Sequence, residues 1–249
     1  MLISESNDVC FFTTCNEKYL SYASIAIKSF QRFFPKSKGY IFTSEKNILR
    51  KKDNIEIITP NFACYFVPSS SKWPKECFWW YMIPEILAKQ HIKFSCYIDP
   101  DVYCFKKHNV KINDDIDIAL FRSKKNRNHT GYIWFNNENL SKKAFYQKMI
   151  SYSDTKYHIG DQELFNKYIK NINKTFNILY FSPQYIYFTH RRNMIKLNKK
   201  RQNFDFNIQN LYIVHYVSKY KPWNTNIRKI KSPIRKKLIE KYYIDKKSL

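Results

Sequence analysis

Two carboxylates stand on either side of a proline where an apolar run of the sequence ends. Asp99 and Asp101 flank Pro100 and follow the run FSCYI at residues 94–98. Side chains two positions apart in an extended backbone point to the same face, so both carboxylates can approach one cation. Pro100 cannot donate a sheet hydrogen bond and therefore ends the strand. Because hard divalent cations take carboxylate oxygens together with substrate phosphates, the tripeptide predicts a metal site, with an Asp-Pro-Asp surface turn as the alternative.

A histidine that could join these carboxylates ends a second apolar run, LYIVH at residues 211–215. The neutral imidazole of His215, added to two carboxylates, would shift the preference of the site from Mg²⁺ toward Mn²⁺. Ser218 and Lys221 follow closely, and Lys221 could supply a point charge to a diphosphate. A histidine at a strand end is commonly an ordinary structural residue, so the prediction depends on the combination and not on His215 alone.

The surrounding sequence has the pattern of an α/β protein. VCFFTT at residues 9–14 predicts a buried strand, and apolar residues at helical spacing predict a helix over 19–34. Strands at 38–43 and 55–58 complete a strand–helix–strand order that is typical of a parallel sheet. Ligand sites in such sheets lie outside the carboxyl ends of the strands. Further helices are predicted at 77–90, 140–152 and 162–169, and further strands at 94–98, 116–121, 132–135, 176–180 and 211–215.

Composition narrows the classes of ligand. The three glycines, Gly39, Gly131 and Gly160, cannot build a G-x-G-x-x-G or P-loop string, so a bound phosphate would depend on a metal or on Lys and Arg. Lys and Arg exceed Asp and Glu by 44 to 20, a formal charge of +24, which favours an anionic partner. Interleaved basic and aromatic residues leave single-stranded nucleic-acid binding as an alternative, although no RRM, zinc-finger or helix-turn-helix signature supports it. A metal-dependent nucleotidyl- or phosphotransferase, which would share the acid pair, is the other alternative.

The cysteines and the chain ends bear on location and domain boundaries. The six cysteines form no C-x-x-C pair, residues 1–10 have no signal-peptide pattern, and no run approaches about 20 apolar residues. We therefore expect a cytoplasmic protein with free thiols. Beyond Trp223 basic and apolar residues alternate, so residues 228–247 could form a solvated tail or lie peripherally on an anionic membrane. The predicted organisation is one α/β domain over 1–224 and a basic tail over 225–249.

Four stretches resemble, in the same order, segments of the family 8 glycosyltransferases. They are FFTTCNEKYLSYASIAIKSFQRFFP, WYMIPEILAKQHIKFSCYIDPDVYCF, GDQELFN and HYVSKYKPW, and they lie within residues 9–224. The resemblance implies a single GT-A-type catalytic domain over 1–224, with a Rossmann-like, mostly parallel mixed sheet flanked by helices. It also implies metal-dependent transfer of a hexose from a UDP-sugar to a glycan, lipid-linked or protein acceptor, with retention of the anomeric configuration.

The same resemblance implies roles for individual residues. The implied ligands of a Mn²⁺ ion, with Mg²⁺ as the alternative, are Asp99, Asp101 and His215. The implied contacts of the donor nucleotide are Thr14, Asn16 and Tyr19 at the uracil, Val102 near the ribose, and Ser218 and Lys221 at the diphosphate. Asp161 and Gln162 would lie beside the donor sugar. Because an amide is a poor nucleophile, we favour a front-face reaction in which Gln162 steadies the cation-like sugar, while Asp161 could also be a helix N-cap.

Two departures from the family pattern concern the donor sugar. Trp80 stands where the family usually has an arginine that assists the donor, so positive charge must come from elsewhere, such as Lys72 or Lys75. The string HTG at residues 129–131 stands where the family has Asn-Ala-Gly. The identity of the transferred sugar therefore does not follow from the resemblance.

Overall fold

A large mixed sheet forms the centre of the protein. The computed structural model describes residues 9–45, 51–52, 54–60, 74–107, 111–122, 127–152, 160–181, 186–188, 211–217, 221–224 and 233–247. Within these residues the sheet consists of β1 (Val9–Thr14), β2 (Lys38–Phe42), β3 (Lys51–Lys52), β4 (Ile55–Ile58), β5 (Phe94–Ile98), β7 (Ile118–Arg122), β8 (Asn128–Asn136) and β9 (Ile178–Phe181). Their order is β3-β4-β2-β1-β5-β8-β7-β9, with four parallel and three antiparallel pairings. The prediction of a mixed, mostly parallel sheet is thereby confirmed.

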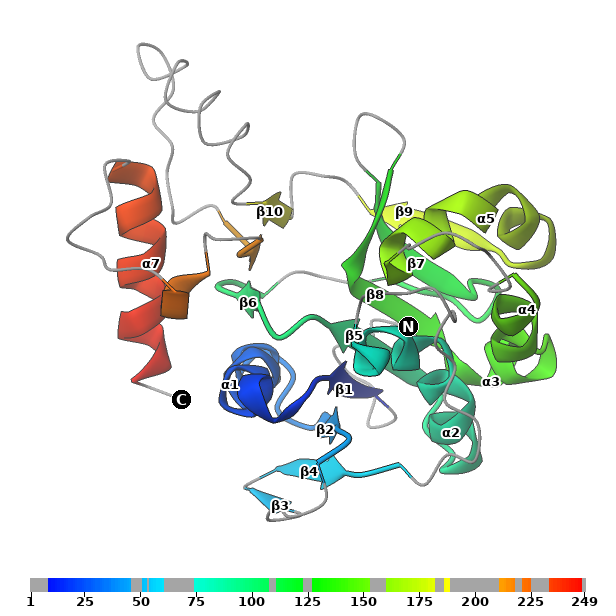
Figure 1. Ribbon diagram of the computed structural model, residues 1–249, viewed down its shortest axis with the longest axis horizontal. Helices are drawn as coiled ribbons and strands as arrows, with labels where there is room; N and C mark the ends of the chain where they lie inside the picture. The colour runs from blue at the N-terminus through cyan, green and yellow to red at the C-terminus, as the bar shows by residue number, and fades with distance from the viewer. Residues whose placement is uncertain are drawn as a thin grey trace, which may run out of the picture.

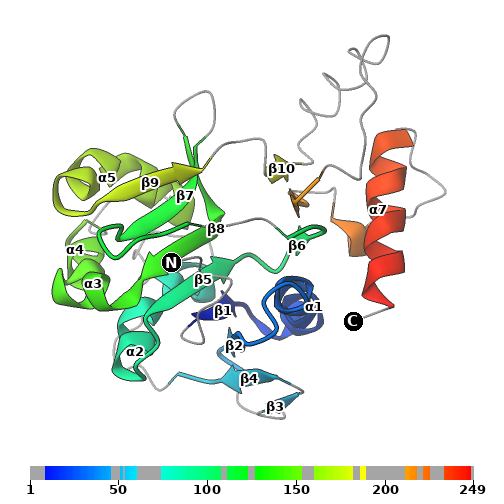
Figure 2. The same ribbon diagram turned by 180° about the vertical axis from the view of Figure 1, so that it is seen from behind.

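Helices cover both faces of this sheet (Figures 1 and 2). One face carries α1 (Leu20–Gln31), and the other carries α2 (Ile83–Lys89), α3 (Asn137–Lys142), α4 (Phe145–Ser151) and α5 (Asp161–Thr175). Strand residues alternate between the two faces, as the period of two in a strand requires. In β1, Phe11 joins the core under α1 and Phe12 joins the core under α2–α5, and both side chains are fully buried. The result is a three-layered α/β/α arrangement.

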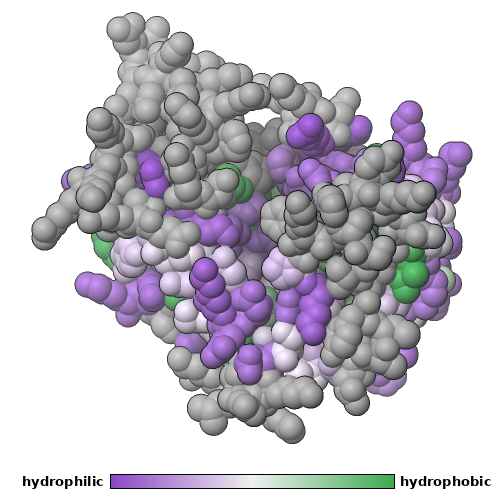
Figure 3. Space-filling model, viewed as in Figure 1, coloured by the Kyte–Doolittle hydropathy of each residue, from purple (hydrophilic) through white to green (hydrophobic). Residues whose placement is uncertain are grey.

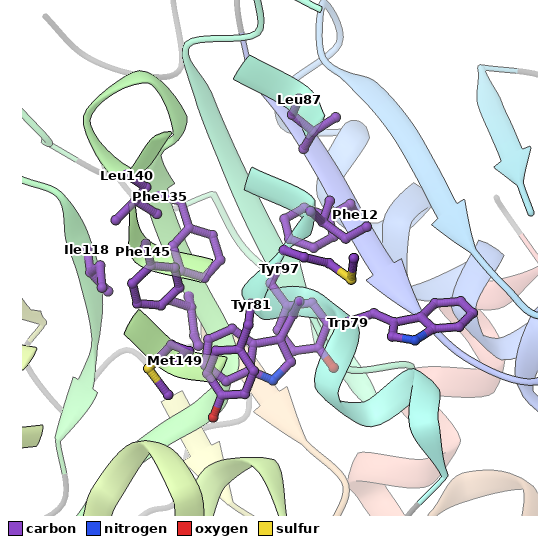
Figure 4. Close-up of a cluster of buried hydrophobic side chains, with 14 of the residues drawn as sticks. Phe12, Trp79, Tyr81, Leu87, Tyr97, Ile118, Phe135, Leu140, Phe145 and Met149 are labelled. Carbon is purple, nitrogen blue, oxygen red and sulfur yellow. The ribbon is translucent and has the colours of Figure 1, made fainter. Parts of the chain in front are cut away.

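The core under α2–α5 is rich in aromatic rings, several of which are drawn in Figure 4. The 3-10 helix η3 (Lys75–Tyr81) contributes Trp79, Trp80 and Tyr81, all fully buried. The Trp80 ring lies 5.9 Å from Tyr97 of β5 and 6.0 Å from Phe135 of β8, centroid to centroid. This packing fixes η3 against the strand that leads to the acidic pair.

A second, smaller sheet lies beside α1. In it β6 (Val102–Cys104) pairs antiparallel with β11 (Ile213–His215), which pairs parallel with β10 (Ile186–Phe188). Helix α7 (Pro233–Lys246) packs on this sheet, and its buried residues form a third core with strand residues: Tyr103, Phe105, Val214, Tyr216, Leu238, Ile239 and Tyr242. Figures 1 and 2 both show α7 next to β6 and α1.

Much of the predicted basic tail is therefore a packed helix. Neither interpretation of its sequence, a solvated tail or a segment lying on a membrane, anticipated that Leu238, Ile239 and Tyr242 are buried against β6 and β11. Lys236 and Lys237 are exposed, and the described surface in Figure 3 is largely hydrophilic. The domain boundary at residue 224 stays a prediction. Across the described ranges, no helix combines the length and apolar character needed to span a membrane.

Two predicted helices are each divided in two. The region 77–90 contains η3 and α2, and Pro84 lies in the first turn of α2, where its missing N–H is tolerated. The region 140–152 contains α3 and α4, separated by Ala144 with a left-handed φ of 53°. Such a backbone strains an alanine because its Cβ approaches the following carbonyl oxygen.

Candidate functional site

The acidic pair joins the two sheets. Asp99 directly follows β5, and its N–H donates to the Gly131 carbonyl of β8 at 2.9 Å. The Val102 N–H donates to the Asp99 carbonyl at 2.9 Å, which closes a turn around Pro100. The Asp101 carbonyl then accepts the Tyr216 N–H at 2.8 Å, from the residue after β11. Backbone hydrogen bonds therefore hold Asp99 to the large sheet and Asp101 to the small one.

The structure brings the predicted metal ligands together. His215 faces Val102 in the β11–β6 register, and its Nε2 lies 3.1 Å from Asp101 Oδ1 and 3.4 Å from Asp99 Oδ2. One ligand atom from each of the three side chains lies within 4.8 Å of the others. Asp101 and His215 are each only 8% exposed. Two carboxylates and an imidazole in such proximity fit one divalent cation.

The electrostatics of the cluster also favour a cation. Burial raises the pKa of Asp99, and the neighbouring Asp101 adds to the increase although His215 opposes it. Burial would also raise the pKa of Asp101, but His215 and Lys221 outweigh it and lower this pKa. Burial would lower the pKa of His215, yet the two carboxylates raise it overall. His215 and Lys221 therefore stabilise the buried Asp101 carboxylate, whereas nearby positive charge does not offset the cost of ionising Asp99, which an added cation would.

Two residues that the sequence did not single out shape this cluster. The Tyr97 hydroxyl donates to Asp99 Oδ1 at 2.7 Å, because residues two apart on β5 share a face. A Cβ built on Gly131 would lie 2.6 Å from Asp99 Oδ2 and would also collide with the His215 ring. A larger residue at position 131 would therefore displace two of the three predicted ligands. The spacing of Tyr97 from Asp99 was the available sequence signal.

Lys221 brings a second positive charge to the cluster. Its Nζ lies 3.0 Å from Asp101 Oδ2, while His215 faces the other oxygen of the same carboxylate. The ammonium also lies 5.3 Å from the ring centroid of Tyr19 and 5.6 Å from that of Trp223. Attraction to Asp101 raises the pKa of Lys221 despite the opposing effect of burial. Lys221 therefore remains charged at neutral pH and available to an anion.

These side chains line one cavity of about 470 Å³ at the carboxyl ends of β1 and β5. Predicted site residues on its wall are Thr14, Asn16, Tyr19, Asp99, Asp101, Asp161, His215 and Lys221. Glu76 also lines it, as a buried carboxylate that accepts a hydrogen bond from the Ser44 hydroxyl. Cavities of this size hold small-molecule ligands.

The residues predicted at the donor sugar form a hydrogen-bonded cluster beside the metal ligands. The Trp80 indole N–H donates to Asp161 Oδ2 at 2.9 Å, and the Thr130 hydroxyl donates to the same oxygen at 3.4 Å. Burial, aided by the charge of Asp99, raises the pKa of Asp161 to about 7. Asp161 is the first residue of α5, and the N-cap position belongs to Gly160 instead. Where the resemblance led us to expect an arginine, a neutral indole therefore holds this carboxylate.

Two predicted site residues that the structure describes, Gln162 and Val102, do not line the cavity. Gln162 Oε1 accepts the Thr130 N–H at 3.3 Å, which places it next to Asp161 but off the cavity wall. Val102 is 1% exposed within the β6–β11 pairing, so its side chain belongs to the core. Ser218 lies outside the described residues, as does Lys72.

The fold and the position of the D-x-D pair define a class, the GT-A glycosyltransferase fold, and the fold prediction is confirmed by solved structures. The glycosyltransferase GlyE of Streptococcus pneumoniae TIGR4 superposes with a TM-score of 0.65 at 19% identity, covering 94% of this chain and 59% of GlyE. The galactosyltransferase LgtC, solved with donor and acceptor sugar analogues, gives 0.61 at 13% identity over 94% of this chain and 95% of LgtC. The bifunctional glycosyltransferase WbbM gives 0.56 at 13% identity over 94% of this chain and 51% of WbbM. No protein-family model and no curated protein matches the chain.

Proposed function

We propose that this protein is a metal-dependent glycosyltransferase that moves a hexose from a UDP-sugar to a glycan, lipid-linked or protein acceptor, with retention of configuration. The observation that carries the proposal is the cluster of Asp99, Asp101 and His215, whose ligand atoms lie within 4.8 Å of one another. The cluster opens into a cavity that Lys221 also lines, on a fold shared with solved glycosyltransferases. Cations gathered at the carboxyl ends of sheet strands suit a nucleotide diphosphate.

The residues on the cavity wall include three groups that would suit the parts of a UDP-sugar. Thr14, Asn16 and Tyr19 include an aromatic ring that suits the base. The metal-ligand cluster and Lys221 would supply the positive charge that a diphosphate needs. Asp161, with Trp80 and Thr130 hydrogen-bonded to it, would provide an acceptor for sugar hydroxyls.

The chemistry assigns a task to each group. Glycosyl transfer has an oxocarbenium-like transition state, and negative charge accumulates on the departing diphosphate. A divalent ion held by Asp99, Asp101 and His215 would supply Lewis-acid stabilisation of that charge. The Lys221 ammonium adds a second positive charge beside it. Asp161 would hold the donor sugar from the cavity wall. Gln162, which lies next to Asp161 but off the wall as described, would have to turn toward the cavity to steady the cation-like sugar during front-face attack.

The test is a panel of nucleotide sugars incubated with the protein and Mn²⁺, with slow donor hydrolysis scored by mass spectrometry. This assay requires no acceptor. We expect hydrolysis of a UDP-hexose that stops when EDTA removes the metal. UDP and Mn²⁺ together should raise the Tm by more than the sum of their separate shifts, because each completes the site of the other.

Two results together would contradict the proposed function. If no nucleotide sugar is hydrolysed and Tm shifts from UDP and Mn²⁺ are strictly independent, the proposal fails. Tight, salt-sensitive binding of oligonucleotides without any effect of metal would then favour a nucleic-acid-binding function instead.

A further inference from the structure

The short segment that carries Lys221 is held by two tyrosines from different helices. The ring of Trp223 stacks on Tyr22 of α1, with centroids 3.9 Å apart and an interplanar angle of 14°. The hydroxyl of Tyr243, on α7, donates to the Pro222 carbonyl at 3.2 Å. Pro222 and Trp223 directly follow Lys221 and begin the 3-10 helix η8 (Pro222–Asn224). Each of them is therefore held by a residue from outside the segment.

Helix α7 is itself fixed to the strand beneath it. Arg32, at the end of α1, donates from Nη2 to the Cys104 carbonyl of β6 at 2.6 Å. The same guanidinium lies 3.3 Å from Asp245 of α7. Together with the third core, this contact sets the position of Tyr243 relative to β6 and β11, and therefore relative to His215.

The position of the Lys221 ammonium depends on the position of the Lys221 backbone. A lysine side chain has a flexible four-carbon stem, so its amine can reach several acceptors unless the backbone and neighbouring groups restrict it. Here the ammonium lies 3.0 Å from Asp101 Oδ2 and near the rings of Tyr19 and Trp223. Tyr22 holds the Trp223 ring that borders this ammonium, and Tyr243 holds the carbonyl next to the Lys221 backbone.

We propose that Tyr22 and Tyr243 are positioning residues that fix the reach of Lys221 toward a diphosphate in the cavity. The inference rests on the proposed function, because it takes the ligand to be a nucleoside diphosphate. Neither tyrosine is part of the cavity wall as described, so each acts through Lys221 and not by touching the ligand. Helix α7 thereby takes part in binding the donor, at a distance.

A double-mutant cycle tests this directly. The dissociation constant of UDP is measured by calorimetry at saturating Mn²⁺ for the full-length wild type, Tyr243→Phe, Lys221→Met and the double variant. We expect Tyr243→Phe to weaken UDP binding about fivefold, the value of one hydrogen bond. In the Lys221→Met background the same change should have no further effect, because the group that Tyr243 positions is gone. An equal loss in both backgrounds would overturn the inference.

The chain offers a matched control and a second route. Tyr242→Phe removes a neighbouring hydroxyl of α7 that has no hydrogen-bond partner among the described residues, and it should leave UDP affinity unchanged. Tyr22→Ala should weaken UDP binding, Tyr22→Phe should restore it, and both effects should vanish with Lys221→Met. This second cycle decides the matter if Tyr243→Phe fails to fold. A wild type that binds no UDP with Mn²⁺ would refute the proposed function and this inference together, whereas additive effects on a wild type that does bind would refute the inference alone.

Discussion

The two sides of the cluster are built in different ways. Asp99 follows β5, a strand that is hydrogen-bonded to β1 on one side and to β8 on the other and is buried between two large cores. His215 ends β11, a strand of three residues whose position depends on the small third core formed with α7. One half of this site, at Asp99, is therefore held in position by the large sheet. The other half depends on a helix that comes late in the sequence.

The largest expected effect comes from removing the imidazole of His215, which lies beside the carboxylates of both Asp99 and Asp101. His215→Ala should reduce transfer by about 1,000-fold or more and weaken Mn²⁺ binding correspondingly, because a ligand is lost from a buried cluster. Metal titration and donor hydrolysis measure both. Normal turnover of His215→Ala at low Mn²⁺ would contradict the ligand assignment.

A pair of core substitutions tests whether only one side depends on α7. Leu238→Ala in α7 and Leu120→Ala in β7 each remove a fully buried leucine, and each should lower the free energy of unfolding by about 3 kcal/mol. Only Leu238→Ala should also weaken Mn²⁺ binding, since its core supports β11. Denaturant unfolding and metal titration at a temperature where both variants are folded separate the two outcomes. Equal metal affinities would show that α7 does not support the cluster.

Substitution of two glycines tests the difference between the cluster and the rest of the protein with a single added methyl group. Gly131→Ala should weaken Mn²⁺ binding about tenfold, because its methyl group would displace Asp99 and His215. Gly39→Ala is the control, since its Cβ would meet Ile27 at 2.7 Å in the core under α1, away from the cluster. Gly39→Ala should therefore lower stability and leave metal affinity intact. The idea is wrong if both glycine variants bind Mn²⁺ as the wild type does.

The smallest effect is expected from a substitution outside the cluster. Ala144→Gly, between α3 and α4, should raise the free energy of unfolding by less than about 1 kcal/mol, because glycine adopts the left-handed backbone without strain. Urea unfolding measures it. Mn²⁺ affinity should not change, and a clear loss of stability would show that the Ala144 methyl group contributes packing that outweighs its strain.

The sequence predicted most of what local patterns can encode. β1 and β5 have the predicted bounds because their apolar runs are buried on both faces, and the acid pair lies at the end of β5 as expected. The juxtaposition of His215 with Asp101 followed from the family resemblance, since no local pattern relates strands so far apart. The bond from Trp80 to Asp161 and the burial of Val102 were not predicted, because they arise only when remote segments pack.

The packing of α7 escaped prediction for a related reason. Its apolar and aromatic residues are interspersed with lysines, so the composition resembles that of a solvated segment. Only the presence of Tyr103 and Tyr216 on a neighbouring sheet turns Leu238 and Tyr242 into core residues. Local periodicity does not show against which surface a helix will pack.

The late place of β11 and α7 in the sequence has a consequence for biogenesis. Every described strand of the large sheet precedes them in the sequence, so these strands are synthesised before the histidine and before the helix that holds it. A nascent polypeptide therefore contains Asp99 and the strands that hold it before it contains His215. A fragment that ended before β11 would carry only one side of the cluster, so under the proposed function it would lack a complete metal site.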